Sequence, residues 1–381
     1  MLKVRPKSVN KNELYDFLNV LEPESFVQAF LTEPPEGFEP MVIHVNGMGL
    51  PGFIMRLDLL TTADERVKRF VRGLKRLLPG FSNITLKSRS IFIGTTVSEY
   101  SIFPRGINLK DFMESAVSKL EEQRCNFLVV KDIPLSSPLL SDSENAFSKR
   151  LISFLANNGF TIVYGQVLGF VPIDFSSTEE YLERFSKSKR KDMKRKLRSF
   201  SHVSVEPIRT GDDFLDDPNI DLLYTLYLNV YENSDIHFDK LTVPFFREVL
   251  KDKKSNGIVF LYRHEGKIVG FNLCYVFGDY LVDKYIGFLY PDSRKLNLYF
   301  LSWFHNLSYC IRNNLKAFIV GWTDPAIKEH LGAEFTHTCH AVYIKNPFLR
   351  FVFKMLKPLF EPDKKYLEDK DITLNQYFIE R

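Results

Sequence analysis

GDYLVDKYIGFLYPD (residues 278–292), RKLNLYFLSWFHNLSYCIRNN (294–314) and AFIVGWTDPA (317–326) follow one another and decide the fold. The apolar residues of the first and third segments suit buried strands, and those of the second recur at the three-and-four spacing of a helix. A strand, a helix and a parallel strand form a βαβ crossover, which is right-handed in nearly all proteins. Ligands of such units bind beyond the carboxyl ends of the strands. We therefore expect a site on the rim formed by residues 290–299 and 322–328.

The same plan occurs earlier in the chain. NFLVVKDIP (126–134) and RLISFLANNGF (150–160) give an apolar strand, a proline, a helix and a glycine, in the order that residues 317–335 repeat. Gly332 is expected to end its short helix as a left-handed cap, and Gly159 holds the corresponding place in the earlier copy. The repeat indicates a duplicated α/β module.

Length and composition bound the class of protein. A chain of 381 residues with 45% hydrophobic content can form two or three cores, and with the repeat this predicts domains at residues 1–170 and 171–381. The net charge of +4 gives the whole chain no strong attraction for nucleic acid. The four cysteines have neither disulfide-framework nor zinc spacing, so we expect no bound metal and a reducing compartment.

The N-terminal residues carry charges throughout and lack the continuous apolar region of a signal peptide. No apolar run approaches the roughly 18 residues that span a bilayer. We expect a cytoplasmic protein without a transmembrane segment.

Two cationic segments have open interpretations. Eight lysines or arginines fall between Lys187 and Arg198, opposed only by Asp192. They predict either an anion-binding helix, for a nucleotide, a phosphate or transfer RNA, or a solvated basic helix. Residues 347–360 mix Phe, Leu and Met with Arg and Lys. They predict either a closing amphipathic helix or a peripheral membrane contact.

The second half of the chain resembles a GNAT-type acyltransferase domain, and within that superfamily it is similar to the Fem-type branch, which includes the peptidoglycan biosynthesis/recognition proteins and the BioF2-like acyltransferases. The resemblance covers roughly residues 165–345. It rests on four segments in order: YLERFSKSKRKDMKRKLRSF (181–200), GIVFLYRHEGKIVGFNLCYVFGDYLVDKYIGF (257–288), NLYFLSWFHNLSYCIRNNL (297–315) and GWTDPAIKEHLGAEF (321–335). It implies an α/β (α+β) fold of tandem GNAT-like domains, each a mixed, mostly antiparallel sheet flanked by helices. The first domain would be degenerate, and the second would carry the activity and end in the closing helix.

Three residues are our catalytic candidates. Asp283 could act as a water-relayed base for an amine, or simply as a salt-bridge partner. Tyr299 lies in the first turn of the predicted helix, where its phenol could protonate a leaving group or merely pack as a half-buried aromatic. The resemblance implies that Lys328 faces the phosphates of the donor or acceptor; the alternative is an i,i+4 pair with Asp324.

The binding candidates surround these residues. A regular strand would point Asp283 and Lys284 to opposite faces, so at most one of them reaches the site. The turn at residues 290–299 has no glycine to let backbone wrap a pyrophosphate, although its cations and the helix N-terminus can hold an anion. The cofactor-binding candidates are Tyr290, Arg294, Lys295 and Asn297, and the substrate-binding candidates are Lys284, Trp322 and Asp324.

These features predict an N-acyltransferase that moves an acyl or aminoacyl group from a thioester or ester to an amine on a small molecule or envelope precursor, with acyl-CoA as the expected co-substrate. One alternative is an aminoacyl-tRNA-dependent peptidyltransferase, which the basic segment favours and the absence of a long helical hairpin between Phe200 and Gly257 disfavours. The other is a non-catalytic binding protein with the same fold. The acyl-transfer predictions require two neighbouring parallel strands, ending near Phe288 and Gly321, to part.

Overall fold

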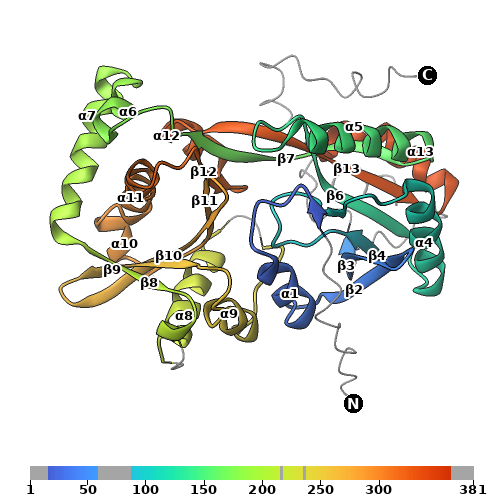
Figure 1. Ribbon diagram of the computed structural model, residues 1–381, viewed down its shortest axis with the longest axis horizontal. Coiled ribbons are helices and arrows are strands. Elements are labelled where there is room, and N and C mark those ends of the chain that lie inside the picture. The colour runs from blue at the N-terminus through green and yellow to red at the C-terminus, as the bar shows by residue number, and fades with distance from the viewer. Residues whose placement is uncertain (1–15, 59–86, 215–217, 235–236, 362–381) are drawn as a thin grey trace, which may run out of the picture. The chain divides into compact units, whose positions relative to one another are not determined.

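The computed structural model describes residues 16–58, 87–214, 218–234 and 237–361 (Figure 1). The chain forms two compact units: unit 1 combines Met1–Val20, Gly37–Leu168 and Phe335–Arg381, and unit 2 combines Leu21–Glu36 with Gly169–Glu334. The predicted boundary after residue 170 lies close to the division at Leu168. The segments 21–36 and 335–381 belong to the unit opposite to the one we expected, because they pair or pack there.

Unit 1 is built on a sheet whose strands stand in the order β2, β3, β4, β6, β13, β7. Strands β4 and β6 are parallel, whereas the pairs β2/β3, β3/β4 and β6/β13 are antiparallel. A short pair, β1 with β5, accompanies it. The bounds are β1 Phe17–Leu18, β2 Glu39–Val45, β3 Met48–Asp58, β4 Lys87–Ile93, β5 Phe103–Pro104, β6 Phe127–Leu135, β7 Thr161–Pro172 and β13 Glu334–Ile344.

The helices of unit 1 include α4 (Leu109–Glu122), α5 (Asp142–Asn157) and α13 (Pro347–Leu356), which continues into a 3-10 turn at Lys357–Phe360. Asn108 caps α4 through its side chain, and Ser141 caps α5 in a reciprocal capping box with Glu144. Leu, Ile, Val and Phe side chains from α4, α5 and the sheet form one core.

Unit 2 contains the remaining strands of this 11-stranded sheet, in the order β8, β9, β10, β11, β12, followed by the last residues of β7. Strands β11 and β12 are parallel, and the other described pairs are antiparallel. The strand bounds are β8 Ser204–Arg209, β9 Ile258–His264, β10 Lys267–Phe277, β11 Tyr280–Phe288 and β12 Ala317–Gly321. The helix bounds are α1 Glu24–Thr32, α6 Thr178–Glu183, α7 Lys187–Leu197, α8 Pro218–Glu232, α9 Val243–Leu250, α10 Asp292–Lys295, α11 Leu298–Arg312 and α12 Pro325–Leu331, with 3-10 turns at Arg198–His202 and Asp212–Phe214.

Helices cover both faces of the unit 2 sheet (Figure 1). Helix α11 buries Leu298, Leu301 and Leu307 in a core on one face, as its three-and-four spacing predicted. On the other face, Phe26 of α1 lies 4.8 Å from the ring of Tyr275 and 6.1 Å from that of Tyr285, measured between ring centroids. Each unit is thus a mixed, mostly antiparallel sheet flanked by helices, and the predicted fold class is confirmed.

Residues with positive φ form a hairpin turn and follow two of the helices. Asn46 and Gly47 both have positive φ between β2 and β3, the conformation that a two-residue hairpin requires. Gly332 caps α12 at φ +97°, and Gly159 follows α5 at φ +85°. Within the described residues, no helix is both long enough and apolar enough to cross a membrane.

Candidate functional site

Strands β11 and β12 pair over a short length and then separate. Their register runs through Tyr280↔Ala317 and Leu281↔Phe318 to Val282↔Ile319. Beyond it, β11 stays paired with β10 and β12 stays paired with β7. We call the point after Val282 and Ile319 the fork. The parallel pairing that the sequence predicted is confirmed, and the strands are not joined along their full length.

Lys328 of α12 reaches the fork. Its side chain is only 5% exposed. A Cβ added to Gly321 would lie 3.9 Å from Lys328 Nζ and 3.9 Å from the carbonyl oxygen of Asp283, so these two groups converge on the end of β12. A Cβ on Gly169 would lie 3.4 Å from Lys328 Cδ and 2.8 Å from Val320 Cγ2. Gly321 and Gly169 therefore both lie beside the buried lysine at the fork.

A chain of buried amides fixes Asp283. Asn272 of β10 donates from Nδ2 to Asp283 Oδ1 at 2.6 Å, and Asn306 of α11 donates from Nδ2 to Asn272 Oδ1 at 2.6 Å. Both asparagines are fully buried. The Cys274 thiol also donates to Asn272 Oδ1, at 3.1 Å. Because buried hydrogen bonds are expensive to break, the carboxylate of Asp283 has a defined orientation.

A β-bulge separates Asp283 from its neighbour. The register shifts between Leu273↔Tyr285 and Cys274↔Asp283, which leaves Lys284 as the extra residue of β11. Lys284 Nζ lies 5.3 Å from the centre of the Phe26 ring, on the α1 face. Asp283 and Lys284 therefore point to opposite faces, and Asp283 is the one that points to the α11 face.

Tyr299 lies in the first turn of α11 and is half-buried. Burial, followed by the negative charges of Asp283 and Asp324, raises the pKa of its phenol. The phenol is accordingly protonated at neutral pH and able to donate. Asp324 is exposed and begins α12 in a left-handed conformation, while Trp322, between β12 and α12, is half-buried. Asp283, Tyr299, Asp324 and Lys328 are thus near neighbours.

The turn between β11 and α11 holds the four cofactor-binding candidates. Arg294 stacks on Tyr290, with its Cζ 4.8 Å from the ring centre, and burial raises the pKa of Tyr290. Lys295 is exposed beside Asp292, at 3.7 Å. Asn297 opens α11 at φ +55° and donates to Ser199 Oγ at 3.4 Å.

Five backbone amides of this turn are used within the turn itself. The amides of residues 293–297 all donate to carbonyl oxygens of residues 289–294, at 2.9 to 3.3 Å. Amides that are already bonded cannot wrap phosphate oxygens, which is how a glycine-rich turn would bind them. Arg294 and Lys295 remain as exposed cations, which can attract an anion but do not enclose it.

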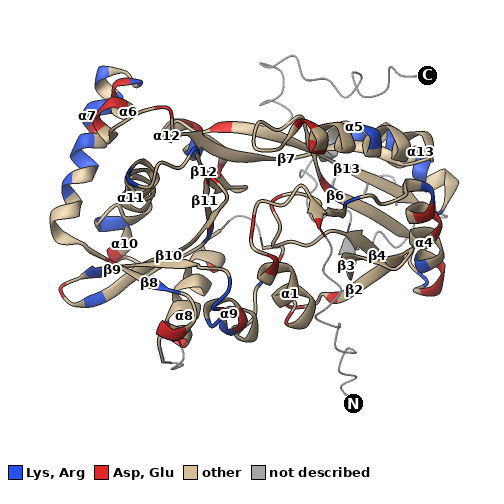
Figure 2. Ribbon diagram, in the orientation of Figure 1, with Lys and Arg blue, Asp and Glu red and all other residues tan. Residues whose placement is uncertain are grey.

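The basic helix α7 lies against the two helices that carry Tyr299 and Lys328. Lys196 Nζ is 5.4 Å from the ring centre of Phe300 on α11. Desolvation and then the charges of Lys189 and Lys196 lower the pKa of His330 on α12. Figure 2 shows Lys and Arg along α7. The predicted cationic segment is a helix that buries only Met193, and its cations lie near α11 and α12.

Sequence reasoning missed the asparagines that hold Asp283. Their signal was present, since Asn272 interrupts the apolar strand GFNLCYVF and Asn306 interrupts an apolar helix face. A polar residue at a buried periodic position requires a partner, and here the partners are functional candidates. Among the residues that the structure describes, no three His, Cys, Asp or Glu side chains lie together as metal ligands would.

Comparison with known proteins defines the family. The model of the FemAB-like family, described as peptidoglycan biosynthesis/recognition, matches residues 139–356, more than half of the chain. The chain belongs to the FemAB-like family. The match includes the fork, α7, α11, α12 and α13, so the candidate site lies inside the FemAB-like region.

Solved structures share the FemAB-like chain's fold at low identity. FemX is 12% identical, with 90% of this chain and 96% of that chain covered and a TM-score of 0.51. L-PGS from Bacillus licheniformis is 9% identical, with 90% and 98% covered and a TM-score of 0.51. The C-terminal domain of a putative lysylphosphatidylglycerol synthetase from Agrobacterium fabrum is 12% identical, with 87% and 89% covered and a TM-score of 0.50. A search of curated protein sequences gives no match.

Proposed function

We propose that the protein is an amide-forming acyltransferase of peptidoglycan metabolism, which transfers an acyl or aminoacyl group to an amine on an envelope precursor. The observation that carries the proposal is the fork, where β11 and β12 stop pairing beside a buried lysine. Ligands of open α/β sheets bind beyond the carboxyl ends of such strands, where neighbouring strands separate. Family membership supports the same chemistry.

The roles that we assign follow from geometry. The amine nitrogen attacks the carbonyl carbon of the donor at the fork, and the bond from that carbon to the leaving oxygen or sulfur breaks. Asp283, held by Asn272, accepts the amine proton through a water. The Tyr299 phenol gives a proton to the leaving group, so the proton count balances. Lys328 stabilises the developing negative charge on the carbonyl oxygen or on the leaving group.

For the donor we propose an order of preference different from the one that the sequence suggested. The sequence favoured acyl-CoA, but the amides of residues 293–297 are used within the turn. The cations of α7 lie near α11 and α12 and favour a donor with a long phosphate backbone, such as an aminoacyl ester of transfer RNA. Lys284 faces α1 and is left out of the proposed site.

The test is a transfer assay with the purified full chain. The protein is incubated with an amine-bearing peptidoglycan precursor and either acetyl-CoA, a long-chain acyl-CoA or a mixture of aminoacyl-tRNAs, and the mass of the precursor is measured. We expect a mass increase with a tRNA donor that disappears in Lys328→Ala. If no donor modifies the precursor and the precursor alone still stabilises the protein against heat, the chain is a binding protein and the proposal fails.

A second measurement separates the donors. Replacing Lys189, Arg190, Lys194 and Arg195 by Glu should abolish tRNA binding, which should also weaken steeply as salt rises. Replacing Lys149, Arg150, Lys251 and Lys254 in the same way leaves α7 intact and serves as the matched control. Equal loss in both variants would show that the overall charge, and not α7, attracts the RNA.

A further inference from the structure

Helix α13 of unit 1 presents apolar side chains to solvent. Of the described large hydrophobic residues, those most exposed are Phe348 at 56%, Phe351 at 62% and Met355 at 68%. Their spacing of three and four places them on one side of the helix. Phe353 points the other way and is buried in unit 1. The helix is therefore apolar both toward its own unit and away from it.

The segment that carries this face is basic, although Glu121 of α4 lies 3.8 Å from Lys345 Nζ. No Asp or Glu occurs between Glu334 and Glu361, whereas Lys345, Arg350, Lys354 and Lys357 do. Lys345 and Lys354 are exposed, and Figure 2 shows basic positions on both α5 and α13. Arg350 is the exception, because its guanidinium donates to the Ile344 carbonyl oxygen and holds the start of α13 against the sheet.

We propose that α13 docks unit 1 on an anionic lipid surface, with Phe348, Phe351 and Met355 in the acyl boundary and Lys345 and Lys354 at the phosphates. Two weak signals, apolar insertion and electrostatic attraction, together give stable peripheral binding. Arg350 and the buried Phe353 hold the helix in place, so it is presented ready-formed. This inference goes beyond the proposed transferase activity and does not depend on it.

The charge of this face favours an anionic lipid surface over a second copy of the chain or residues 362–381. A second copy of the chain docking through the same face would set Lys354 and Lys345 against equivalent cations, because a two-fold contact is self-complementary. Residues 362–381 carry five Asp or Glu and four Lys or Arg, a balance that offers little attraction to a basic face. An anionic bilayer matches both the apolar centre and the cationic border.

Vesicle co-sedimentation of the full chain tests the proposal. Vesicles of phosphatidylcholine alone are compared with vesicles containing about one third phosphatidylglycerol, at about 0.1 M and about 0.5 M NaCl. We expect at least tenfold stronger partitioning to the anionic vesicles at low salt, reduced at least fivefold at high salt. Phe351→Asp should lower it at least tenfold, and Lys354→Glu about fivefold or more. Equal binding to both lipids, or no binding, would overturn the proposal.

Two controls keep the result specific. Leu222→Asp replaces an exposed leucine on α8 of unit 2 and should leave partitioning unchanged. Phe351 and Lys354 are exposed, so their variants should melt like the wild type. If light scattering shows a dimer that Phe351→Asp dissociates while vesicles do not bind, the face is a contact between copies and the lipid proposal is wrong.

Discussion

The two units share the same order of elements around a parallel strand pair, β4/β6 in unit 1 and β11/β12 in unit 2, but the residues at the ends of these pairs differ. In each unit a long helix follows the first strand, the parallel strand comes next, and a second helix closes at a left-handed glycine. Unit 1 pairs one residue further, to Ile93↔Val130. The residue after Val130 is Lys131, and Gly321 holds the corresponding place in unit 2.

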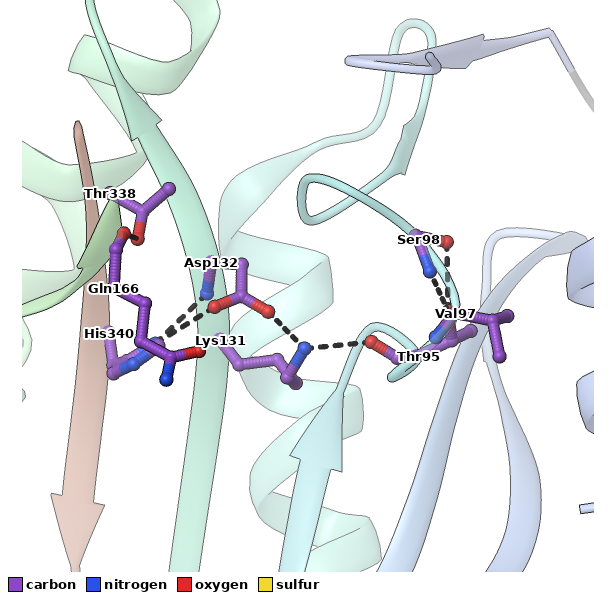
Figure 3. A network of polar contacts seen from close by, with 8 residues as sticks. All are labelled: Thr95, Val97, Ser98, Lys131, Asp132, Gln166, Thr338 and His340. Carbon is purple, nitrogen blue, oxygen red and sulfur yellow. Dashed lines mark hydrogen bonds and ion pairs between the residues drawn. The ribbon is translucent and has the colours of Figure 1, made fainter. Parts of the chain in front are cut away.

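In unit 1, Lys131 and Asp132 at this end of β6 belong to a network of polar contacts (Figure 3). Lys131 Nζ donates to the Thr95 carbonyl oxygen at 2.8 Å and also pairs with Asp132. The amide of Asp132 donates to His340 Nδ1 at 3.0 Å. In unit 2 the strand ends in a glycine, and the lysine arrives from α12 instead. In unit 1 the lysine belongs to the strand, and its hydrogen bonds occupy the strand end. In unit 2 the lysine belongs to the helix, and the strand itself ends in a glycine, which has no side chain.

The largest expected contrast is between the two buried lysines. Lys328→Ala should lower kcat/KM about 10²- to 10³-fold, since a charge-stabilising group is removed. Lys131→Ala should keep the activity of the folded protein and lose about 3 kcal/mol of unfolding free energy, because it leaves Asp132 buried and unpaired. Steady-state kinetics and chemical denaturation of both variants measure this. Equal losses of activity in Lys328→Ala and Lys131→Ala would refute a catalytic role that belongs to Lys328 alone.

The next largest contrast should be in the unfolding free energy lost when Gly332 or Gly159 is replaced by alanine. A Cβ on Gly332 would lie 2.6 Å from Tyr181 Oη and 2.7 Å from Phe185 Cζ, whereas on Gly159 the nearest atom is Arg350 Nη1 at 3.3 Å. Both alanine variants carry the cost of positive φ, about 1 kcal/mol. Gly332→Ala adds overpacking and should lose about 3 kcal/mol in all. Urea unfolding decides, and similar losses would contradict the packing argument.

Removing the Tyr299 hydroxyl should affect the chemistry and not the fold. We expect Tyr299→Phe to lower kcat about 10²-fold. Because burial and the two carboxylates raise the phenol's pKa, the wild-type rate should show no loss from phenol ionisation as pH rises to about 10. Tyr309→Phe, on the same helix, is the matched control. A wild-type rate that falls between pH 8 and 9 would count against Tyr299 as the acid.

The smallest effect concerns pH and His305 of α11, which packs 4.5 Å from the Phe260 ring centre. Desolvation, and then the charge of Arg312, lowers its pKa to about 4. The unfolded chain, with a pKa of about 6.5, binds the proton first as pH falls, so stability is full above that pH and is lost below it. Between pH 7.5 and 5.5 the loss should be about 1 kcal/mol, and His305→Phe should abolish it. His44→Phe, an exposed substitution, should not.

For the two strand ends compared above, the sequence predicted the backbone features better than the contacts of the side chains. Local signals sufficed for the cap at Gly332 and for the helix at Leu298, because capping chemistry and apolar spacing act within a few residues. The bulge that turns Lys284 away from Asp283 arises from cross-strand register, which no local pattern encodes.

Contacts between residues that are far apart in the sequence also could not be predicted from local patterns. Asn272 and Asn306 are 34 residues apart in the chain and meet only once β10 and α11 are packed. Phe26 lies in the first tenth of the sequence and packs on Tyr275 in unit 2, which composition and spacing do not indicate. The types of residue at the fork could be predicted from the sequence, but the side chains that contact them could not.

Helix α1 carries a practical consequence. Its Phe26 and Phe30 are fully buried, yet it precedes the rest of unit 2 by more than a hundred residues. A shortened protein that begins at Gly169 would retain every candidate catalytic residue and strip the cover from Tyr275 and Tyr285. Whoever wishes to isolate this half for crystallisation should splice residues 21–36 back onto it through a flexible tether.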